Sequence, residues 1–470
     1  MTGRPLHRLV AASGLSNVAD GITVVGVSLV AVTLTRSPVL VSLVSAAATL
    51  PWLLLALHAG ALADRHDRRR IMVAANALRA AALAGVALTA WLGLLSLPVL
   101  LAGTLLTGVA EVLADTSAQS VLPMIVPRER LGEANGRLVA VETVGNNFLG
   151  APAAGILVGI GATAALGTPA LLYAAAALTL LGMRGRFRVE TPSTRPLRAD
   201  IAEGLRHLWG HRVLRSLALF SGVLNFANAA YFAVFVLWVV GEESRVGLTS
   251  AGYGVLTASL AAGAVAGSLV ADRLARRTGQ IRTLIVADVV NGLLLFVPVL
   301  LPTVPGIAVT AVLLGVTNAV SNVVIVSLRQ RIVPEAMLGR INATARLIGM
   351  GATPLGAAAG GFLAERAGLP AVFCAAAALC VVAVAVVSRS VTTASVTAAE
   401  EAARAEETRT AEETRTAEET RTAEAAPMEG TRTAETVRTE EVRGEAARAE
   451  NAPTAENTRA GEEIRAGETA

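Results

Sequence analysis

The stretch Gly60-Ala-Leu-Ala-Asp64-Arg65-His66-Asp67-Arg68-Arg69-Arg70 decides the fold, because it is a dense run of charge between two long apolar segments. Those segments are residues 39–59 and 71–95, and the block between them holds two carboxylates and four arginines. A similar block, Gly267-Ser-Leu-Val-Ala-Asp272-Arg273-Leu-Ala-Arg276-Arg277, begins 207 residues later. One apolar–basic–apolar unit therefore occurs twice, which predicts two copies of one membrane module.

The composition is typical of a polytopic membrane protein. Of the 470 residues, 53% are hydrophobic, and the mean hydropathy of +0.58 is too high for a soluble protein. The sequence pI near 9.8 does not indicate nucleic acid, because the arginines lie in short loops between apolar runs. The two cysteines, Cys374 and Cys380, share one apolar run, so a disulfide framework is excluded.

A membrane-spanning helix needs about 20 apolar residues, and twelve segments qualify. We therefore predict an all-α membrane protein of twelve transmembrane helices arranged as two six-helix halves. The predicted helices are residues 6–33, 39–59, 71–95, 98–124, 138–160, 162–183, 213–240, 251–271, 283–301, 305–329, 341–364 and 369–387.

Arginine counts predict the orientation in the membrane. One set of loops carries the two basic blocks together with arginines near the amino end, near residue 130 and near residue 335, whereas the other set carries only Arg36, Arg245 and Arg366. Arginine and lysine concentrate in cytoplasmic loops. We therefore expect a multi-pass protein of the cell (cytoplasmic) membrane with both termini in the cytoplasm.

The predicted domain boundaries follow from these segments. Residues 1–183 form an N-terminal six-helix bundle, 184–212 a cytoplasmic linker, 213–388 a C-terminal six-helix bundle, and 389–470 a low-complexity tail that is disordered or transiently helical. In the linker, Leu197, Ile201, Leu205 and Leu208 repeat at helical spacing. This spacing predicts either an amphipathic helix on the membrane face or a solvated linker helix.

A second pair of landmarks supports the duplication. Val126-Pro127, followed by Leu131-Gly132 and Asn135, parallels Val333-Pro334, followed by Leu338-Gly339 and Asn342, again at an offset of 207. Each half has an even number of helices, so both halves have the same topology. We expect them to be related by an axis along the membrane normal, with a pathway between them.

These motifs resemble those of the major facilitator superfamily over residues 1–388. The block from Gly60 to Arg69 resembles the loop signature G-x-L-A-D-R-x-G-R-R/K between helices 2 and 3, with Asp67 in place of the usual Gly. Together with that loop, Asn17-Val-Ala-Asp20-Gly21 resembles the bacterial drug, macrolide and siderophore (enterobactin-type) exporter branch. The segment Gly150-Ala-Pro152-Ala-Ala-Gly155 resembles the antiporter signature of helix 5.

The resemblance implies a cytoplasmic gate at the basic loops. In the family, the Asp and Arg at the positions of Asp64 and Arg65 form an ion-pair network that contacts a helix end of the other half. The predicted gate residues are Gly60, Asp64, Arg65, Arg68, Arg69, Asp272 and Arg273. The alternative, a topology signal alone, explains the arginines well and Asp64 poorly.

Ionisable groups at bilayer depth are costly, so each is a candidate functional residue. Asp20 lies near the middle of helix 1, and Glu111 and Asp115 lie four residues apart on one face of helix 4. Two such carboxylates repel each other when both are ionised, so one of them can hold a proton near neutral pH. Arg79 of helix 3 is the candidate counter-ion. The alternative is that these groups only hydrogen-bond to neighbouring helices.

Amides and small residues complete the candidate site. The predicted cavity-lining residues are Asn17, Asn146, Asn225, Asn228, Asn318 and Asn322, the last two at the repeat positions of Glu111 and Asp115. Gly150, Pro152 and Gly155 are predicted to form a hinge or a packing seam. Glu142, just inside helix 5, lies close enough to the cytoplasm to snorkel, which favours a structural role, whereas Arg346 of helix 11 is compatible with a functional or a structural role.

The sequence thus predicts a proton-driven exporter of a small, largely apolar compound, acting by alternating access. We expect small-molecule substrate, protons and lipid as partners, no nucleic acid, no cofactor or metal, and a monomer. Phosphate-binding loops, paired-His metal motifs and nucleophile elbows are absent from the sequence, which disfavours an enzyme. The alternatives are a facilitator or importer of a small metabolite, or a non-transporting membrane sensor or scaffold.

Overall fold

The computed structural model describes residues 3–127, 130–183, 185, 187, 197–333, 335–405, 408–409, 412–421 and 439. Within these ranges twelve helical segments are long and apolar enough to cross a membrane, which confirms the predicted all-α class. They are α1 (Gly3–Leu34), α2 (Pro38–Arg65), α3 (Arg68–Trp91), α4 (Leu97–Ile125), α5 to α6 (Leu131–Ile160), α7 (Ala162–Leu181), α9 (Arg212–Val239), α10 (Ser250–Thr278), α11 (Gln280–Leu300), α12 (Val304–Ile332), α13 (Glu335–Ala367) and α14 (Leu369–Ser390).

Local sequence signals set several helix starts. Ser37 caps α2 through a hydrogen bond from the amide of Leu40, and Pro38 occupies the first turn, where a missing N–H costs nothing. Asp67 caps α3, because its carboxylate accepts hydrogen bonds from the amides of Arg69 and Arg70. The Asp at this position of the loop motif is therefore the residue that starts the next helix.

The fifth span is interrupted by a π-helical segment, η2 (Val144–Gly150), between α5 (Leu131–Thr143) and α6 (Ala151–Ile160). The amide of Ala151 bonds to the carbonyl of Asn146, five residues back. Pro152 follows at once, and its ring would clash with a normal helical carbonyl while offering no N–H of its own. The wider turn before Pro152 relieves that conflict.

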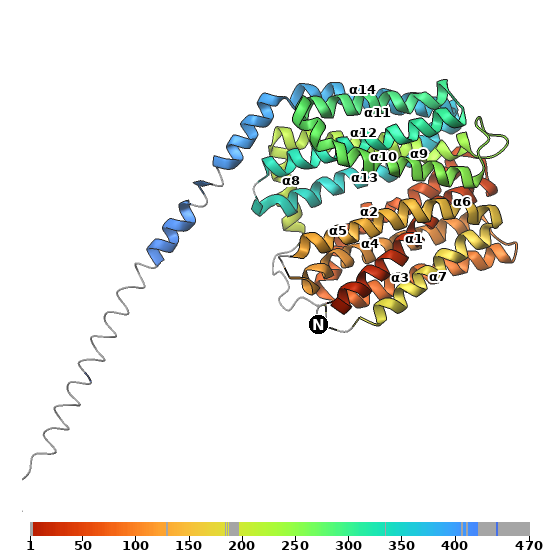
Figure 1. The fold of residues 1–470 in the computed structure, drawn as a ribbon, viewed down its shortest axis with the longest axis horizontal. Helices are drawn as coiled ribbons and strands as arrows, with labels where there is room; N and C mark the ends of the chain where they lie inside the picture. The colour runs from red at the N-terminus through yellow and green to blue at the C-terminus, as the bar shows by residue number, and fades with distance from the viewer. Residues whose placement is uncertain are drawn as a thin grey trace, which may run out of the picture. The chain divides into compact units, whose positions relative to one another are not determined.

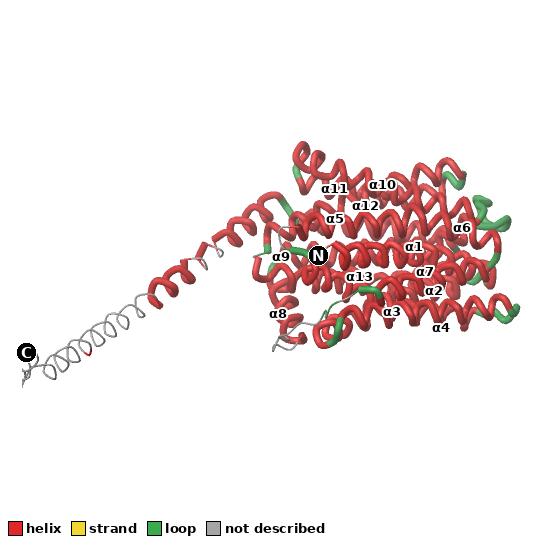
Figure 2. Tube along the Cα trace, turned by 60° about the horizontal axis from the view of Figure 1, so that its bottom comes forward, coloured by secondary structure: helices red, strands yellow, loops and turns green. Residues whose placement is uncertain are grey.

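The helices form two halves that pack side by side. Figure 1 shows α1–α7 together on one side and α9–α14 on the other, and Figure 2 shows the connecting loops at the two ends of the bundle. Within the first half α3 packs on α4 and α7; within the second half α10 packs on α12, and α9 on α13 and α14. Contacts between the halves run chiefly through α2 with α13 and through α6 with α10.

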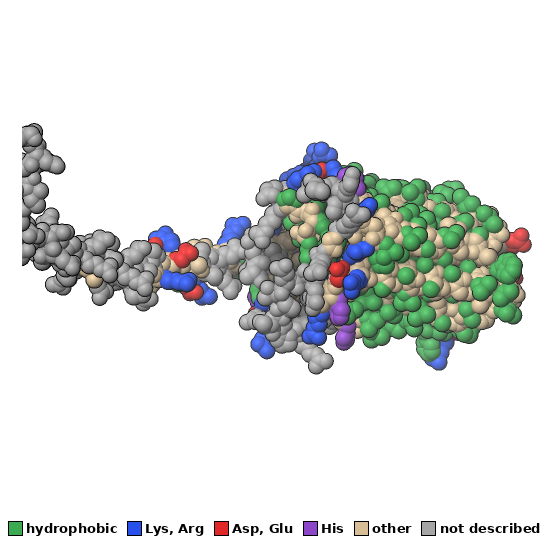
Figure 3. Space-filling view, turned by 90° about the horizontal axis from the view of Figure 1, so that it is seen from below, with side chains coloured by type: hydrophobic (Ala, Val, Ile, Leu, Met, Phe, Trp, Pro, Cys, Tyr) green, Lys and Arg blue, Asp and Glu red, His purple; other side chains and the backbone are tan. Residues whose placement is uncertain are grey.

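The two ends of the bundle differ in charge. We call the end that carries Arg68–Arg70 and Arg276–Arg277 the basic end, and the other the opposite end. Figure 3 shows one face, on which hydrophobic side chains cover the length of the bundle while arginine and histidine side chains gather mainly at one end. This distribution is that of a helix bundle embedded in lipid.

The two ends also differ in packing. Toward the opposite end one hydrophobic core includes residues of both halves, among them Val41, Ala154, Phe235 and Tyr253. Toward the basic end the cores are separate: one around Leu9 and Leu122 in the first half, and one in the second half around helices α9, α11 and α12. The halves are therefore joined at the opposite end and part toward the basic end.

Close backbone approaches seal the opposite end. A Cβ on Gly254 would lie 2.6 Å from the carbonyl oxygen of Ala151, and one on Gly361 would overlap Ser42. Two polar contacts also link the halves there. The Ser37 hydroxyl donates to a Glu365 carboxylate oxygen at 3.0 Å, and the Arg36 guanidinium donates to the carbonyl of Val240 at 3.1 Å.

The predicted linker helix is present as α8 (Leu197–Gly210), while residues 188–196 lie outside the described ranges. Leu208 is buried, whereas Leu205 and Trp209 are largely exposed. A Glu203 carboxylate oxygen lies 2.9 Å from a nitrogen of Arg340 on α13. The helix is therefore tied to the basic end of the second half.

The predicted tail divides into two parts. Residues 393–403 belong to the same compact unit as the twelve spans, where Val396, Ala399 and Ala403 are buried and Glu400 lies 3.6 Å from Arg331. Residues 404–470 form a separate unit, most of which lies outside the described ranges. Its described stretch 412–421 is helical and exposed, with an ion pair of 3.0 Å between Arg415 and Glu419.

Candidate functional site

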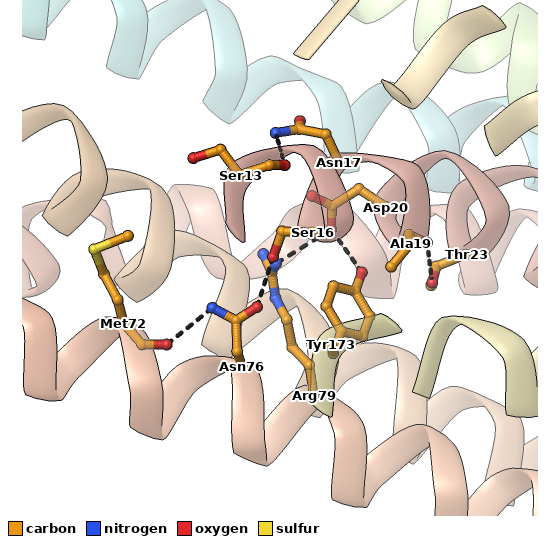
Figure 4. Close-up of polar contacts among 10 residues, drawn as sticks. All are labelled: Ser13, Ser16, Asn17, Ala19, Asp20, Thr23, Met72, Asn76, Arg79 and Tyr173. Carbon is orange, nitrogen blue, oxygen red and sulfur yellow. Dashed lines mark hydrogen bonds and ion pairs between the residues drawn. The ribbon is translucent and has the colours of Figure 1, made fainter. Parts of the chain in front are cut away.

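A buried ion pair lies at the middle of the first half. An Nη1 atom of Arg79 on α3 lies 3.2 Å from Oδ1 of Asp20 on α1, and the hydroxyl of Tyr173 on α7 donates to the same oxygen at 2.6 Å. Figure 4 shows these three side chains converging from three helices. The Arg79 side chain is 1% exposed and that of Asp20 13% exposed. The pair that the sequence left open is thus Asp20 with Arg79.

The guanidinium of Arg79 is only partly satisfied. Its carbon lies 5.0 Å from the centroid of the Tyr173 ring, which is a cation–π distance. Its Nε and Nη2 atoms are buried without a hydrogen-bond partner among the described residues. Because arginine stays charged at any physiological pH, the buried charge depends on nearby anions.

Three polar residues that sequence reasoning missed surround this pair: Tyr173, Ser16 and Asn76. The Ser16 hydroxyl donates to Oδ1 of Asn76 at 2.6 Å, and Asn76 donates to the carbonyl of Met72 at 2.9 Å. Asn76 precedes Arg79 by three residues and so lies on the same helix face. That spacing was available in the sequence as a signal.

The two carboxylates of α4 lie near the same arginine. Glu111 and Asp115 are half-buried. Both interact electrostatically with Arg79 and with Asp20. Asp20 thus pairs directly with the buried guanidinium, and Glu111 and Asp115 interact with it electrostatically without an ion pair.

A cavity of about 360 Å³ lies beside this group. It extends from Asn135 and Leu138, near the basic end, to Asp20 and Asp115 at mid-depth. Its wall comes almost wholly from the first half, and Arg346 of α13 is the one contribution of the second half to its lining among the described residues. The lining residues are Ala12, Ser13, Ser16, Asn17, Asp20, Met72, Asn76, Ala114, Asp115, Ala118, Gln119, Asn135, Leu138, Val139, Glu142, Leu180 and Arg346.

The predicted cavity asparagines separate into two groups. Asn17 lines the cavity and donates to the carbonyl of Ser13 at 2.8 Å. Asn225, Asn228 and Asn318 each donate to a carbonyl one turn back on their own helix. Asn322 is exposed and Asn146 half-buried. Apart from Asn17, none of the six is part of the cavity lining described above.

Arginines of the first basic loop bind helix ends within their own half. Arg68 donates from Nη1 to the carbonyl of Ser120 on α4 at 2.6 Å. Arg69 donates to the carbonyls of Leu180 and Leu181 on α7 at 2.9 and 2.5 Å. Carbonyls at helix C-termini lack intrahelical donors, so a cation there stabilises the end of the helix. The loop thus fastens α4 and α7 to α3.

Of the other predicted gate residues, the two arginines are exposed. Arg65 is exposed, and the side chain of Asp64 lies outside the described ones. A Cβ on Gly60 would meet no atom within 4 Å. In the second loop, Asp272 pairs with Arg276 of its own helix at 2.7 Å, and Arg273 is exposed. The hydrogen bonds of Arg68 and Arg69 and the ion pair of Asp272 described above each lie within one half.

The predicted hinge residues make close helix contacts. A Cβ on Gly150 would lie 2.7 Å from Cα of Gly21 on α1, so the two backbones touch there. Pro152 follows the π-helical segment and lies close to Gly254, and Gly155 faces the backbone of Ser250 on α10. These residues border both the first-half core and the seam between the halves.

Asp288 on α11 is a further buried carboxylate. It was not among the predicted site residues, although a charged residue within an apolar run is a signal in the sequence. It is 2% exposed and accepts a hydrogen bond from the Ser321 hydroxyl at 2.8 Å. One turn on, Asn291 donates to Thr317 at 3.1 Å. These four groups bind α11 to α12 within the second half. Among the described residues, no group of three His, Cys, Asp or Glu side chains is placed to hold a metal ion.

Comparison with known proteins matches residues 5–420 to a family described as transmembrane secretion effectors. The chain is 28% identical over 393 residues to the multidrug efflux pump Tap of Mycobacterium tuberculosis, covering 79% of this chain and 90% of that protein. It is 29% identical over 295 residues to the enterobactin exporter EntS of Citrobacter koseri, covering 60% of this chain and 67% of that one.

The fold also matches a solved transporter. A mutant of the nucleoside transporter NupG superposes with a TM-score of 0.69 at 13% identity, covering 83% of this chain and 100% of that one. At this identity the likeness concerns the fold alone.

Proposed function

The chain belongs to the transmembrane secretion effector family, in the drug and siderophore exporter branch of the major facilitator superfamily, and from that premise we propose that it exports a small, largely apolar compound in exchange for protons. Its relatives are transporters rather than enzymes. The observation that carries the proposal is the group of three carboxylates around Arg79, beside a cavity that reaches the basic end.

Charge balance supports proton binding at this group. Asp20 is paired with Arg79, and the other cation that interacts with Asp115, Arg346, is exposed and makes no ion pair with Glu111 or Asp115 among the described residues. An unpaired charge at bilayer depth costs several kcal/mol, roughly 2.5–3.5 on insertion scales. Taking up a proton removes that cost. The α4 pair is thus the proposed proton carrier, and Asp20 with Arg79 the fixed partner beside it.

The packing of the two ends supports alternating access. We place the basic end in the cytoplasm by the positive-inside rule. The joined core and the glycine contacts then seal the outer side, while the cavity reaches toward the cytoplasm, as a cytoplasm-facing state requires. Export needs a second state in which the seams of α2 with α13 and α6 with α10 open.

The direct test is drug efflux from cells or proteoliposomes with and without a proton uncoupler. Asp115→Asn and Glu111→Gln should abolish uncoupler-sensitive efflux while the protein still inserts, because the amides cannot carry a proton. Glu242→Gln, an exposed carboxylate in the loop after α9, is the matched control and should transport normally. Full proton-driven efflux by both α4 variants would refute the proton assignment.

Two further measurements separate the alternatives. In oriented vesicles, an antiporter accumulates substrate inside only when the interior is made more acidic than the outside, because protons then leave as substrate enters. A facilitator only equilibrates the substrate, whatever the pH difference. Removal of residues 404–470, the separate unit, should leave efflux unchanged in a transporter. A sensor or scaffold that acts through the tail would lose its activity.

A further inference from the structure

We infer that the cavity of the first half selects compounds that carry a positive charge on an apolar body. The inference rests on the proposed function, in that it names the substrate class of the same cavity.

Carboxylates outnumber cations around the cavity. Asp20 on α1, Asp115 on α4 and Glu142 on α5 reach it from three different helices. Glu111 interacts with this group from one turn away. Arg79 and Arg346 are the cations that interact with Asp115. Four carboxylates thus face two arginines around the cavity, which leaves two negative charges in excess. The excess falls to one when Glu111 and Asp115 share a proton.

The arginines are already engaged, whereas two of the carboxylates are not. Arg79 is paired with Asp20 and stacks on Tyr173. The guanidinium carbon of Arg346 lies 5.0 Å from the Trp52 ring centroid, so this cation rests on an aromatic face. Asp115 and Glu142 line the cavity without a hydrogen bond or ion pair shorter than 4.0 Å recorded among the described residues. These two carboxylates are the groups available to a ligand.

The rest of the wall suits an apolar body. Met72, Leu138, Val139 and Leu180 line the cavity together with three alanines. A volume of about 360 Å³ lies within the range of sites that bind drug-sized ligands. An anionic ligand of the same shape would meet the excess negative charge in a site of low dielectric, where like charges repel strongly.

Two ions of nearly the same shape and opposite charge test the inference. Tetraphenylphosphonium and tetraphenylborate binding is measured by equilibrium dialysis with the full chain in phosphatidylcholine nanodiscs, after subtraction of binding to empty nanodiscs. The cation should bind at least about tenfold more tightly than the anion, which corresponds to about 1.4 kcal/mol.

Two variants should change cation affinity in opposite directions. Glu142→Gln removes an exposed negative charge and should weaken tetraphenylphosphonium binding several-fold. Arg346→Gln removes the positive charge of the second half and should strengthen it. A general folding defect lowers affinity in both variants, so opposite signs identify an electrostatic effect. Glu242→Gln is the control for a carboxylate far from the cavity.

Equal binding of both ions, tighter binding of the borate, or shifts of the same sign in the two variants would overturn the inference. Binding is measured without a proton gradient, so it is independent of coupling. If cation selectivity is found while the uncoupler leaves efflux intact, the antiport proposal fails and the substrate class stands. If efflux is proton-driven and the ions bind equally, the reverse holds.

Discussion

Replacing Asp20 by Asn should destabilise the protein far more than replacing Arg79 by Gln, although each change breaks the same ion pair. After Asp20→Asn, a guanidinium that is 1% exposed keeps its charge and loses its closest anion. After Arg79→Gln, the remaining carboxyl can take up a proton and become neutral, which a guanidinium cannot do. The asymmetry follows from the chemistry of the two groups rather than from their packing.

The magnitude follows from burial. Removing one partner of a buried ion pair costs roughly 3–5 kcal/mol, since an uncompensated charge remains. Glu111 and Asp115 lie near Arg79 and offset part of that cost, so we expect about 3 kcal/mol for Asp20→Asn. For Arg79→Gln we expect about 1–2 kcal/mol, which is the usual cost of leaving a buried hydrogen-bonding group unsatisfied.

The assay is thermal stability of the detergent-purified full chain, followed by fluorescence-detected size exclusion. A loss of about 3 kcal/mol should lower Tm by several degrees, given about 2–4 °C per kcal/mol for somewhat smaller proteins. The double variant Asp20→Asn with Arg79→Gln should recover stability relative to Asp20→Asn alone, because no charge is left unpaired. Equal effects of the two single variants, or no recovery in the double variant, would refute the reasoning.

Two structural predictions concern the ends of the bundle. Asp67→Ala removes the cap of α3 and should cost about 1 kcal/mol in the same stability assay; an unchanged Tm would show that the cap contributes nothing. Gly254→Val places a side chain against the backbone of α6 and should open the opposite end. A cysteine introduced at Ser37 should then react faster with a membrane-impermeant thiol reagent, whereas Gly85→Val, where a Cβ meets no atom within 4 Å, should leave its rate unchanged.

The fold was largely predictable because long apolar runs and arginine-rich loops are local signals. The composition of each apolar run predicts a helix, and the repeat of Asp64-Arg65 as Asp272-Arg273 indicates the duplication. The interruption before Pro152 was not predicted as a π-helical segment, since proline indicates a disturbance without specifying its form. The burial of residues 393–403 was also missed, because their apolar residues are sparse and are buried only by contact with the second half.

The charged residues of the site could be predicted from the sequence, but the contacts between them could not. Asp20, Glu111, Asp115 and Arg79 stand out because ionisable residues are rare in apolar runs. Which carboxylate meets Arg79 depends on the rotation of three helices about their axes, and that rotation is set by packing. Tyr173 gave no signal, because a tyrosine in a membrane helix is equally compatible with the bilayer interface.

The hydrophobic core that both halves share at the opposite end makes the choice between states sensitive to temperature. Separating the halves there exposes apolar surface, which raises the heat capacity of the separated form. Apolar burial weakens on cooling, so cold should loosen this seal before it loosens the ion pairs and helix caps elsewhere. Because this closure rests mainly on apolar contacts, the population of the state closed at the opposite end should depend on temperature.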